Sequence, residues 1–491
     1  MTAVQSPAQP VSRIGISALS CYVPAYEVQL EDWCRWREDN WSKVAQVVGN
    51  SFRMRGPNEN AYTMAATAVL KLIRDHDVDP AQIGFLGLGT ESSTDNSAGA
   101  VIVKGMVNQA LSAQGHVPIA RACEVPEFKH ACLGGVYAMK AAVRYLATDG
   151  ADRVAIVVCA DVAEYERSTS GEPTQGAGAV AMLIEPEARI ATINLRTTGS
   201  ASDYRGVDFR KPFLRFMQQA PSELAQPRDF PVFNGKYSTS CYVDEVLAAM
   251  RDLFRRLPGS PATFLRNQGA IFLHRPYQRM AETGLSISYL LALALGDEAD
   301  QAELAGYAAA AEVDPAALKT ELIEEHPDLG PAPEVVDSHP LATQTARVFR
   351  STETFQQLMT RLGTGPVGRV GNLYTASLPL WLAAGLEEAA AEDLPLGDQL
   401  LTIGYGSGDA AEVIPLELVP GWQAAARRSA VADALEHAIA IDQDTYEALH
   451  EGRQPDTLGE VAVDRFVIDR IGARNAGIND LGIEYYRYDS A

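Results

Sequence analysis

The stretch HACLGG places Cys132, one of six cysteines in a chain of 491 residues, just before an apolar pattern that predicts a helix. A cysteine is nucleophilic as its thiolate, and the N-terminus of a helix lowers the pKa of a thiol. Gly134 and Gly135 remove side chains where a bulky thioester would approach, and glycine tolerates a tight strand-to-helix turn. These residues indicate a nucleophile. The alternative interpretation is a packed cysteine in a glycine turn.

Candidate acid–base residues lie at the ends of two other apolar stretches. Glu91 follows the run IGFLGLGT, and His274 follows IFL in the second half of the chain. Burial raises the pKa of a carboxyl and suits Glu91 to proton transfer, although a helix cap is the competing interpretation. His130 shares the face of Cys132 if that stretch is extended, so it stays a second candidate. The other histidines occupy polar surroundings and are predicted at the surface: His76, His116, His326, His339, His437 and His450.

Polar residues on two glycine turns extend this set. GNLYT carries Asn372 and Tyr374, and YGSG carries Ser407. Amide and hydroxyl groups on such turns can bind an oxyanion or a pantetheine arm. Each of these signals is weak by itself.

The elements that must position these residues alternate between strand and helix. β-branched apolar runs predict buried strands, and apolar spacing at helical period predicts helices. The first half contains strands at 83–92, 153–161 and 176–186, with helices at 62–75 and 135–150. The second half repeats the theme with strand–tip–helix at 268–280, a glycine turn into a helix at 367–389, and strand–turn–strand at 399–418. This pattern predicts a duplicated α/β architecture.

Composition narrows the class of protein. A chain of 491 residues exceeds the usual size of one core, so two domains or two fused halves are expected. The net charge of −22 disfavours binding to nucleic acid or to an anionic membrane. No apolar run approaches a membrane span, and the first twelve residues lack the pattern of a signal peptide, so a cytoplasmic protein is expected. The remaining cysteines are predicted to be small core residues: Cys21, Cys34, Cys123, Cys159 and Cys241.

Three segments fall outside this alternation. Residues 1–12 are predicted to form a flexible tail. Residues 296–347 are rich in Ala and Glu and are predicted to form a helical insertion at the surface. Residues 420–491 are a polar mixture of helix and short strands.

Eight motifs in order resemble those of the 3-hydroxy-3-methylglutaryl-CoA (HMG-CoA) synthase family, within the thiolase superfamily. They are GTESSTDNS (89–97), FKHACLGG (128–135), CADVAEY (159–165), GEPTQGAGAVAMLI (171–184), FPVFNGKYS (230–238), FLHRPYQRM (272–280), GNLYTAS (371–377) and YGSGDAAE (405–412). The resemblance runs from about residue 12 to the C-terminus, except for the insertion.

The resemblance implies the thiolase fold, a five-layered αβαβα arrangement of two pseudo-duplicated halves. The N-terminal half would span 13–188 and carry Glu91 and Cys132. The C-terminal half would span 189–491 and carry His274, Asn372 and Ser407. The site would lie between the halves, and the protein would be a homodimer.

The resemblance also implies a role for each catalytic residue. Cys132 would accept the acetyl group of acetyl-CoA, Glu91 would deprotonate its methyl group, and His274 would polarise the acetoacetyl thioester. Acetyl-CoA and acetoacetyl-CoA would be substrates. The implied chemistry needs neither a metal nor a redox cofactor, so none is expected. The residues implied in binding substrate and CoA are Tyr165, Thr174, Pro276, Arg279, Asn372, Tyr374 and Ser407.

The sequence departs from the family pattern at five positions. Leu133 stands where many members have Tyr, and His130 where many have Asn, Glu or Gln. Arg279 and Thr283 stand at family lysines, and Arg228 near a family serine. These changes put in doubt how the carrier of the acyl group is held.

Four hypotheses therefore stay open. The first is an HMG-CoA synthase of the mevalonate pathway acting on two CoA thioesters. The second is a polyketide β-branching synthase acting on a β-ketoacyl chain held by an acyl carrier protein. The third is an inactive thiolase-like scaffold subunit, and the fourth is a decarboxylating ketosynthase that would not need Glu91.

Overall fold

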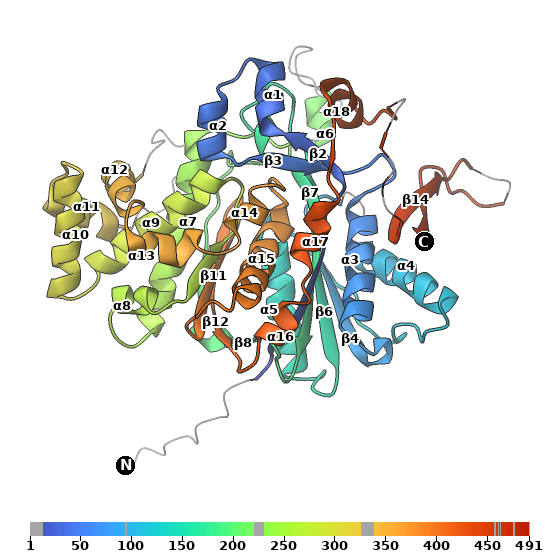
Figure 1. Cartoon of the computed structure of the whole chain (residues 1–491), viewed down its shortest axis with the longest axis horizontal. Coiled ribbons are helices and arrows are strands. Elements are labelled where there is room, and N and C mark those ends of the chain that lie inside the picture. The colour runs from blue at the N-terminus through green and yellow to red at the C-terminus, as the bar shows by residue number, and fades with distance from the viewer. Residues whose placement is uncertain are drawn as a thin grey trace.

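A ten-stranded mixed sheet organises the chain in the computed structural model (Figure 1). The structure describes residues 13–93, 96–219, 230–325, 338–455, 458–459, 461, 463–474 and 477–490. The hydrogen-bonded strand order is β10-β11-β12-β8-β1-β7-β6-β4-β5, with β9 paired to β12. The predicted tail at 1–12 lies outside the described residues.

The N-terminal half supplies five strands and two outer helices. β4 and β6 are parallel, whereas β6–β7 and β7–β1 are antiparallel. The helix α3 packs on β1, β6 and β7, and α4 packs beside α3. The bounds are β1 (Gly15–Tyr22), α3 (Ala61–Asp75), β4 (Ile83–Gly89), α4 (Gly99–Ala113), β5 (Glu127–Phe128), β6 (Val154–Ala163) and β7 (Gly176–Glu185). The expected strands and the helix at 62–75 are thus confirmed.

The C-terminal half repeats this pairing. β10 and β11 are parallel, whereas β11–β12 and β12–β9 are antiparallel. The helix α7 packs on β9, β11 and β12, and α9 packs beside α7. The bounds are β9 (Gly199–Ser202), α7 (Lys236–Arg256), β10 (Ala270–Leu273), α9 (Gln278–Ala294), β11 (Gln399–Gly406) and β12 (Ala410–Leu418). The same sequence of parallel and antiparallel pairings in both halves confirms the duplicated architecture.

Two helices form the layer between the halves. α5 (Gly134–Leu146) packs on β4 and β6, and α15 (Ser377–Ala391) packs on β10 and β11 (Figure 1). Outer helices, strands, central helices, strands and outer helices make the predicted five layers. β8 (Ala191–Ile193) pairs with both β1 and β12 and makes the sheet continuous. The predicted boundary at 188 falls just before β8, and the exact division between the halves stays a prediction.

The predicted insertion is helical where the structure describes it. α10 (Glu298–Ala310), α11 (Pro315–Ile323) and α12 (Pro340–Phe349) pack on α9, at the edge of the molecule (Figure 1). Residues 326–337 lie outside the described residues.

A cap covers the end of the sheet at which the candidate residues lie. It contains a three-stranded sheet, β13-β2-β3, together with the helices α1, α2 and α18 (Figure 1). The hairpin β14–β15 lies against α3 and α4. The bounds are β2 (Tyr26–Gln29), α1 (Leu30–Arg37), α2 (Trp41–Val47), β3 (Ser51–Met54), β13 (Ile439–Ala440), α18 (Gln443–His450), β14 (Arg465–Ile471) and β15 (Glu484–Asp489). The remaining helices are α6 (Leu214–Met217), α8 (Pro261–Arg266), α13 (Glu353–Phe355), α14 (Thr364–Val367), α16 (Gln423–Ala426) and α17 (Val431–Glu436), with short turns at η1 (Pro80–Gln82), η2 (Glu172–Thr174), η3 (Leu195–Thr197), η4 (Gln356–Thr360) and η5 (Tyr374–Ala376).

Three of the histidines predicted at the surface are buried, namely His76, His339 and His450. His339 Nε2 lies 2.9 Å from Asp244 Oδ1, so a buried carboxylate compensates its polarity. His326 lies outside the described residues. Among the described helices, none is long and apolar enough to cross a membrane.

Candidate active site

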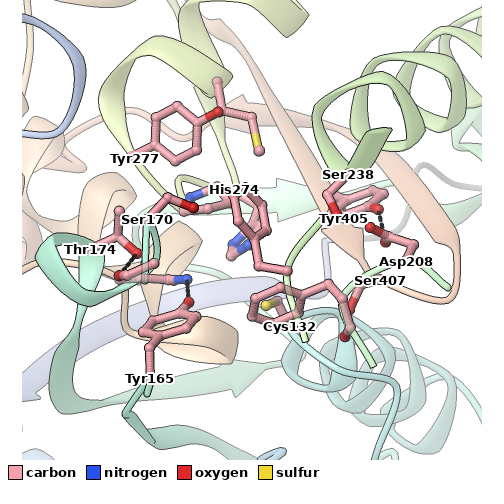
Figure 2. A pocket seen from close by; sticks show the side chains of 16 residues that line it. Cys132, Tyr165, Ser170, Thr174, Asp208, Ser238, His274, Tyr277, Tyr405 and Ser407 are labelled. Carbon is pink, nitrogen blue, oxygen red and sulfur yellow. Dashed lines mark hydrogen bonds between the residues drawn. The ribbon is translucent and has the colours of Figure 1, made fainter. Parts of the chain in front are cut away.

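A narrow pocket of about 60 Å³ opens between the two halves, beneath the cap. Residues from both halves line it, and Figure 2 shows Cys132 and His274 projecting into it from different elements. The lining residues that the sequence predicted are Cys132, Tyr165, Thr174, His274, Pro276, Asn372 and Ser407. These seven residues lie up to 275 positions apart in the sequence, from Cys132 to Ser407, and the structure brings them together at one pocket.

Cys132 lies in the turn that leads from β5 into α5. The preceding residue, Ala131, has a φ of +43°, a left-handed conformation that turns the chain sharply before the helix. The thiol is buried and its Sγ donates a hydrogen bond to Glu91 Oε2 at 3.5 Å. Burial raises the pKa of Cys132 well above its usual value, and the charges of Glu91 and Asp161 add to this shift. This direction is opposite to the lowering expected from the helix N-terminus, because burial and two nearby carboxylates disfavour the thiolate.

The two glycines after Cys132 serve the packing of α5. A Cβ on Gly135 would lie 2.2 Å from Cys159 Sγ in β6, and a Cβ on Gly134 would lie 2.5 Å from the Phe128 carbonyl oxygen. A Cβ on Gly89 would in turn lie 2.4 Å from the Gly135 nitrogen. The start of α5 therefore crosses β4 and β6 at a distance that only glycine permits. These contacts give the two glycines a packing role, and room for a thioester stays a prediction.

Glu91 is placed by the loop that follows β4. Its side chain is 10% exposed, and Lys211 Nζ lies 3.6 Å from its Oε1. Burial raises the pKa of Glu91 to about 7, Lys211 opposes the shift, and Asp161 adds to it. A carboxyl with this pKa can both accept and return a proton near neutral pH. The competing interpretation as a helix cap is wrong, because α4 begins at Gly99 and has no side-chain cap.

Asp161, near the end of β6, holds two site loops together. Its Oδ1 accepts hydrogen bonds from the backbone nitrogens of Glu91 and Ser92 and from the hydroxyls of Thr90 and Ser92. Its Oδ2 accepts from the backbone nitrogen and the hydroxyl of Thr375. One buried carboxylate thus fixes the Glu91 loop of the first half against the η5 turn of the second half.

His274 follows β10 directly and is 1% exposed. Its backbone nitrogen donates to the Ile403 carbonyl, and its ring stacks on Tyr405 with centroids 6.5 Å apart. Neither ring nitrogen has a hydrogen-bond partner among the described residues. Burial lowers the pKa of His274 to about 3, so the imidazole is neutral and has a polar ring available to a ligand.

Asn372 and Tyr165 line the pocket, whereas Tyr374, which the sequence also predicted in binding, is fully buried and does not line it. Asn372 Nδ2 donates to Tyr165 Oη at 3.3 Å, and Asn372 Oδ1 accepts from the Tyr374 nitrogen at 2.9 Å. Tyr374 has a φ of +46° and packs against Cys132 and Tyr165 in one buried cluster. The amide of Asn372 is therefore held in one orientation, with its Nδ2 at the pocket.

The hydroxyls of Thr174 and Ser407 already have partners. Thr174 Oγ1 donates to the Gly171 carbonyl at 2.8 Å, and Ser407 Oγ donates to the Phe209 carbonyl at 3.3 Å. Both residues and Pro276 shape the pocket in this structure.

Arg279 does not line the pocket. Its guanidinium lies 3.0 Å from Glu282 Oε2 and donates to the Gln46 carbonyl at 3.3 Å. Thr283, on the same helix, is buried and donates to the Arg279 carbonyl. Of the two positions at which the resemblance implies lysine, only Arg279 carries a positive charge, and its guanidinium already lies beside Glu282.

Several lining residues were not singled out from the sequence. They are Ser170, Gly171, Asp208, Phe209, Phe233, Ser238, Tyr277, Met280 and Tyr405. The motif that contains His274 also contains Tyr277 and Met280, and the motif that contains Ser407 begins with Tyr405. Closeness in the sequence to these two residues was the signal that could have identified them. Asp208 and Phe209 had no such signal, because their place depends on the path of the chain after β9.

A buried acidic cluster adjoins the pocket behind Tyr405. Asp208, Cys241 and Asp409 have side-chain atoms close enough to hold a metal ion. Arg205 is also buried there, with Nε 3.6 Å from Asp409 Oδ2 and Nη1 3.1 Å from Asp244 Oδ2. A guanidinium at this position supplies the positive charge itself, so the cluster is better described as an ion-pair network.

Comparisons with known proteins show which proteins the chain is similar to. A family profile described as hydroxymethylglutaryl-coenzyme A synthase N terminal matches residues 10–189. The hydroxymethylglutaryl-CoA synthase of Enterococcus faecalis is 27% identical over 437 residues, which cover 89% of this chain and 91% of that protein.

Solved structures extend the likeness over nearly the whole chain. The structure described as MvaS in complex with 3-hydroxy-3-methylglutaryl coenzyme A is 26% identical, with a TM-score of 0.75, covering 97% of this chain and 99% of that one. The HMG synthase of the curacin biosynthetic pathway, in complex with acetyl donor-ACP, is 18% identical with a TM-score of 0.67 over 97% of this chain and 99% of that one. The second likeness concerns the fold.

Proposed function

The chain belongs to the HMG-CoA synthase family of the thiolase superfamily and is an enzyme of the acyltransferase type, and we propose that it condenses acetyl-CoA with acetoacetyl-CoA to give HMG-CoA. One observation carries this proposal: Glu91 accepts a hydrogen bond from Cys132, and the unpartnered imidazole of His274 lines the same pocket. These groups are a nucleophile, a base and a polariser, the three roles that a condensation of two thioesters requires.

The first step is transfer of the acetyl group to Cys132. The thiol proton passes to Glu91 Oε2 as the sulfur attacks the thioester carbonyl. The bond from the carbonyl carbon to the CoA sulfur breaks, and the CoA thiolate takes the proton back from Glu91. The products are acetyl-Cys132 and CoA. The covalent bond tethers the donor and keeps its methyl group acidic, because a thioester stabilises an α-carbanion.

The second step forms the carbon–carbon bond. Glu91 removes a proton from the acetyl methyl group, and the carbanion attacks the ketone carbon of acetoacetyl-CoA. The neutral imidazole of His274 donates a hydrogen bond to the ketone oxygen as negative charge develops on it. That oxygen takes up the proton that Glu91 removed from the methyl group, and water then cleaves the bond to Cys132, which releases HMG-CoA and the free thiol. The balanced reaction consumes one acetyl-CoA, one acetoacetyl-CoA and one water.

This chemistry separates the proposal from a decarboxylating ketosynthase. In that reaction loss of CO₂ generates the carbanion, so no base is needed beside the nucleophile. The hydrogen bond between Cys132 and Glu91, and the pKa of about 7 at Glu91, favour a reaction in which a carboxylate abstracts a proton. A Glu91→Ala variant that kept full condensing activity would contradict the proposal.

A second candidate is the same condensation on a β-ketoacyl chain held by an acyl carrier protein. The observation that favours it is the reduced positive charge where CoA phosphates would be held, since Arg279 is paired with Glu282 and Thr283 is uncharged. Carrier proteins present a phosphopantetheine arm without the adenosine phosphates of CoA. Whether the enzyme serves primary or secondary metabolism depends on whether CoA or a carrier protein holds its acyl substrates.

Intact-mass spectrometry of the purified protein tests the proposal. Wild type and Cys132→Ala are incubated with acetyl-CoA, with acetyl-carrier protein, and then with acetoacetyl-CoA. We expect an acetyl adduct and HMG-CoA from the CoA substrates in the wild type only. An adduct from the carrier alone would establish the second candidate, and no adduct from either would make the scaffold hypothesis the leading one.

Location and assembly belong to the same proposal. All six cysteines are free thiols, and the mechanism needs Cys132 reduced, which is consistent with a cytoplasmic enzyme. A homodimer is proposed from the family resemblance. Light scattering on the purified protein would measure the molar mass of the assembly.

A further inference from the structure

Lys211 and Cys132 contact different oxygens of the Glu91 carboxylate. Lys211 Nζ is 3.6 Å from Glu91 Oε1, while Cys132 Sγ is 3.5 Å from Glu91 Oε2. The same ammonium lies 5.4 Å from the centroid of the Tyr374 ring, which adds a cation–π contact. The two oxygens of one carboxylate therefore have different neighbours, a cation on one and the nucleophile on the other.

The segment that carries Lys211 is fixed to both halves of the molecule. Two residues earlier, the Phe209 ring packs on Tyr165 and on Tyr374, with centroids 5.8 and 6.2 Å apart. The Phe209 carbonyl accepts the hydroxyl of Ser407. Arg210 is bridged through its carbonyl to the Val232 nitrogen at 2.9 Å. The two residues just before Lys211, Phe209 and Arg210, are thus held in place by these contacts.

The charges that face Glu91 make this contact important. Asp161, near the end of β6, adds to the raised pKa of Glu91, and burial raises the pKa values of Cys132, Tyr165 and Tyr374, which favours their neutral forms. Lys211 is the cation in contact with Glu91 among the residues that the structure describes. Without it, a carboxylate beside Asp161 and out of water would hold its proton more strongly.

We propose that Lys211 is a positioning residue that keeps the Glu91 carboxylate ionised and turns its Oε2 toward Cys132 and the acetyl group. This inference rests on the proposed function and adds a residue that none of the eight motifs contains. Lys211 exchanges no proton with substrate in this account. It acts through Glu91, by charge and by holding Oε1.

The test compares pH profiles of the variants Lys211→Met, Lys211→Arg and the control Arg215→Met. Arg215 is a second cation of the same segment, but it lies over the exposed rings of Phe213 and Phe216 and does not contact Glu91. Condensation is followed from pH 5.5 to 9.5 after preloading each enzyme with acetyl-CoA. Intact mass measures the acetylated fraction.

We expect Lys211→Met to move the acid limb of the profile upward by about one pH unit, the lower end of the range for one opposite charge. The rate near pH 6.5 then falls about eightfold, by the loss of ionised Glu91, and approaches wild type above pH 9. Lys211→Arg keeps the acid limb in place, and Arg215→Met leaves the profile unchanged.

An acid limb that does not move in Lys211→Met would overturn the inference, whether the rate is unchanged or lowered equally at every pH. Failure of the proposed function is distinguishable from this, since the wild type would then form neither adduct nor product. A second readout needs no condensation. The pH dependence of Cys132 alkylation by iodoacetamide, followed by intact mass, is expected to shift along the pH axis in Lys211→Met, as the acid limb of condensation does.

Discussion

Replacing Gly135 with alanine tests why glycines follow the nucleophile. The new Cβ would lie 2.2 Å from Cys159 Sγ, well inside van der Waals contact, while the next neighbours stand at ordinary distances of 3.4 Å (Thr375 O) and 3.5 Å (Cys159 Cβ). The collision is therefore with one sulfur atom. Overpacking of this kind costs about 1–3 kcal/mol. The better helix propensity of alanine offsets at most about 1 kcal/mol of it.

Cys159→Ala supplies the matched background, because it removes that sulfur. In Cys159→Ala the added methyl group meets only the contacts near 3.5 Å, so Gly135→Ala is expected to cost little there. A double-mutant cycle should then show a favourable coupling of about 1–2 kcal/mol. Urea unfolding followed by tryptophan fluorescence measures the four proteins, and intact mass measures acetylation of Cys132 in each.

The two explanations of the glycine make different predictions for the double variant. If Gly135 serves packing, Cys159→Ala restores both the stability and the acetylation that Gly135→Ala loses. If Gly135 gives the thioester room, Gly135→Ala keeps wild-type stability, and acetylation stays low in both backgrounds. The second result would refute the packing argument.

Three further predictions concern one buried ion pair outside the pocket lining and two residues of the site. Lys140→Met should lower the free energy of unfolding by about 3–5 kcal/mol, since it leaves Glu412 buried without the ammonium now 2.5 Å away, and urea unfolding checks this. The condensation rate should fall as the pH drops below about 7, because Glu91 must be ionised to accept a proton and its pKa lies there; a steady-state pH profile checks this, and a limb near pH 4 would contradict it. His274→Ala should still form the acetyl adduct at Cys132 but lose condensation by 10²-fold or more, roughly the value of one oxyanion donor, in a stopped mass assay.

Elements with a strong local pattern could be predicted from the sequence. VAIVVCAD is apolar on both faces and β-branched, and it forms the central strand β6. Residues 62–75 carry apolar side chains at helical period, and Asn60 with Thr63 forms a capping box at the start of α3. Glu91 and His274 were candidates because they follow buried strands, and Cys132 because it precedes two glycines and a predicted helix.

The rest depends on residues that meet only in the folded chain. Asp161 ends an apolar strand and gives no sign that six hydrogen bonds converge on it from Thr90, Glu91, Ser92 and Thr375. His339 was predicted at the surface because its partner Asp244 stands 95 positions earlier in the chain. Lys211 lies outside the eight motifs, so the sequence did not mark its contact with Glu91.

The pKa values of Cys132 and Glu91 explain how one carboxylate can serve both steps of the proposed reaction. Burial raises the pKa of both groups, so two adjacent anions are unfavourable and the resting thiol keeps its proton on a hydrogen bond to Oε2. In the proposed first step the sulfur attacks the acyl carbonyl as its proton passes to Oε2. Once Cys132 is acylated it has no proton to donate, and Oε2 loses its partner. In the proposed second step the same oxygen removes a proton from the methyl group of the acetyl thioester.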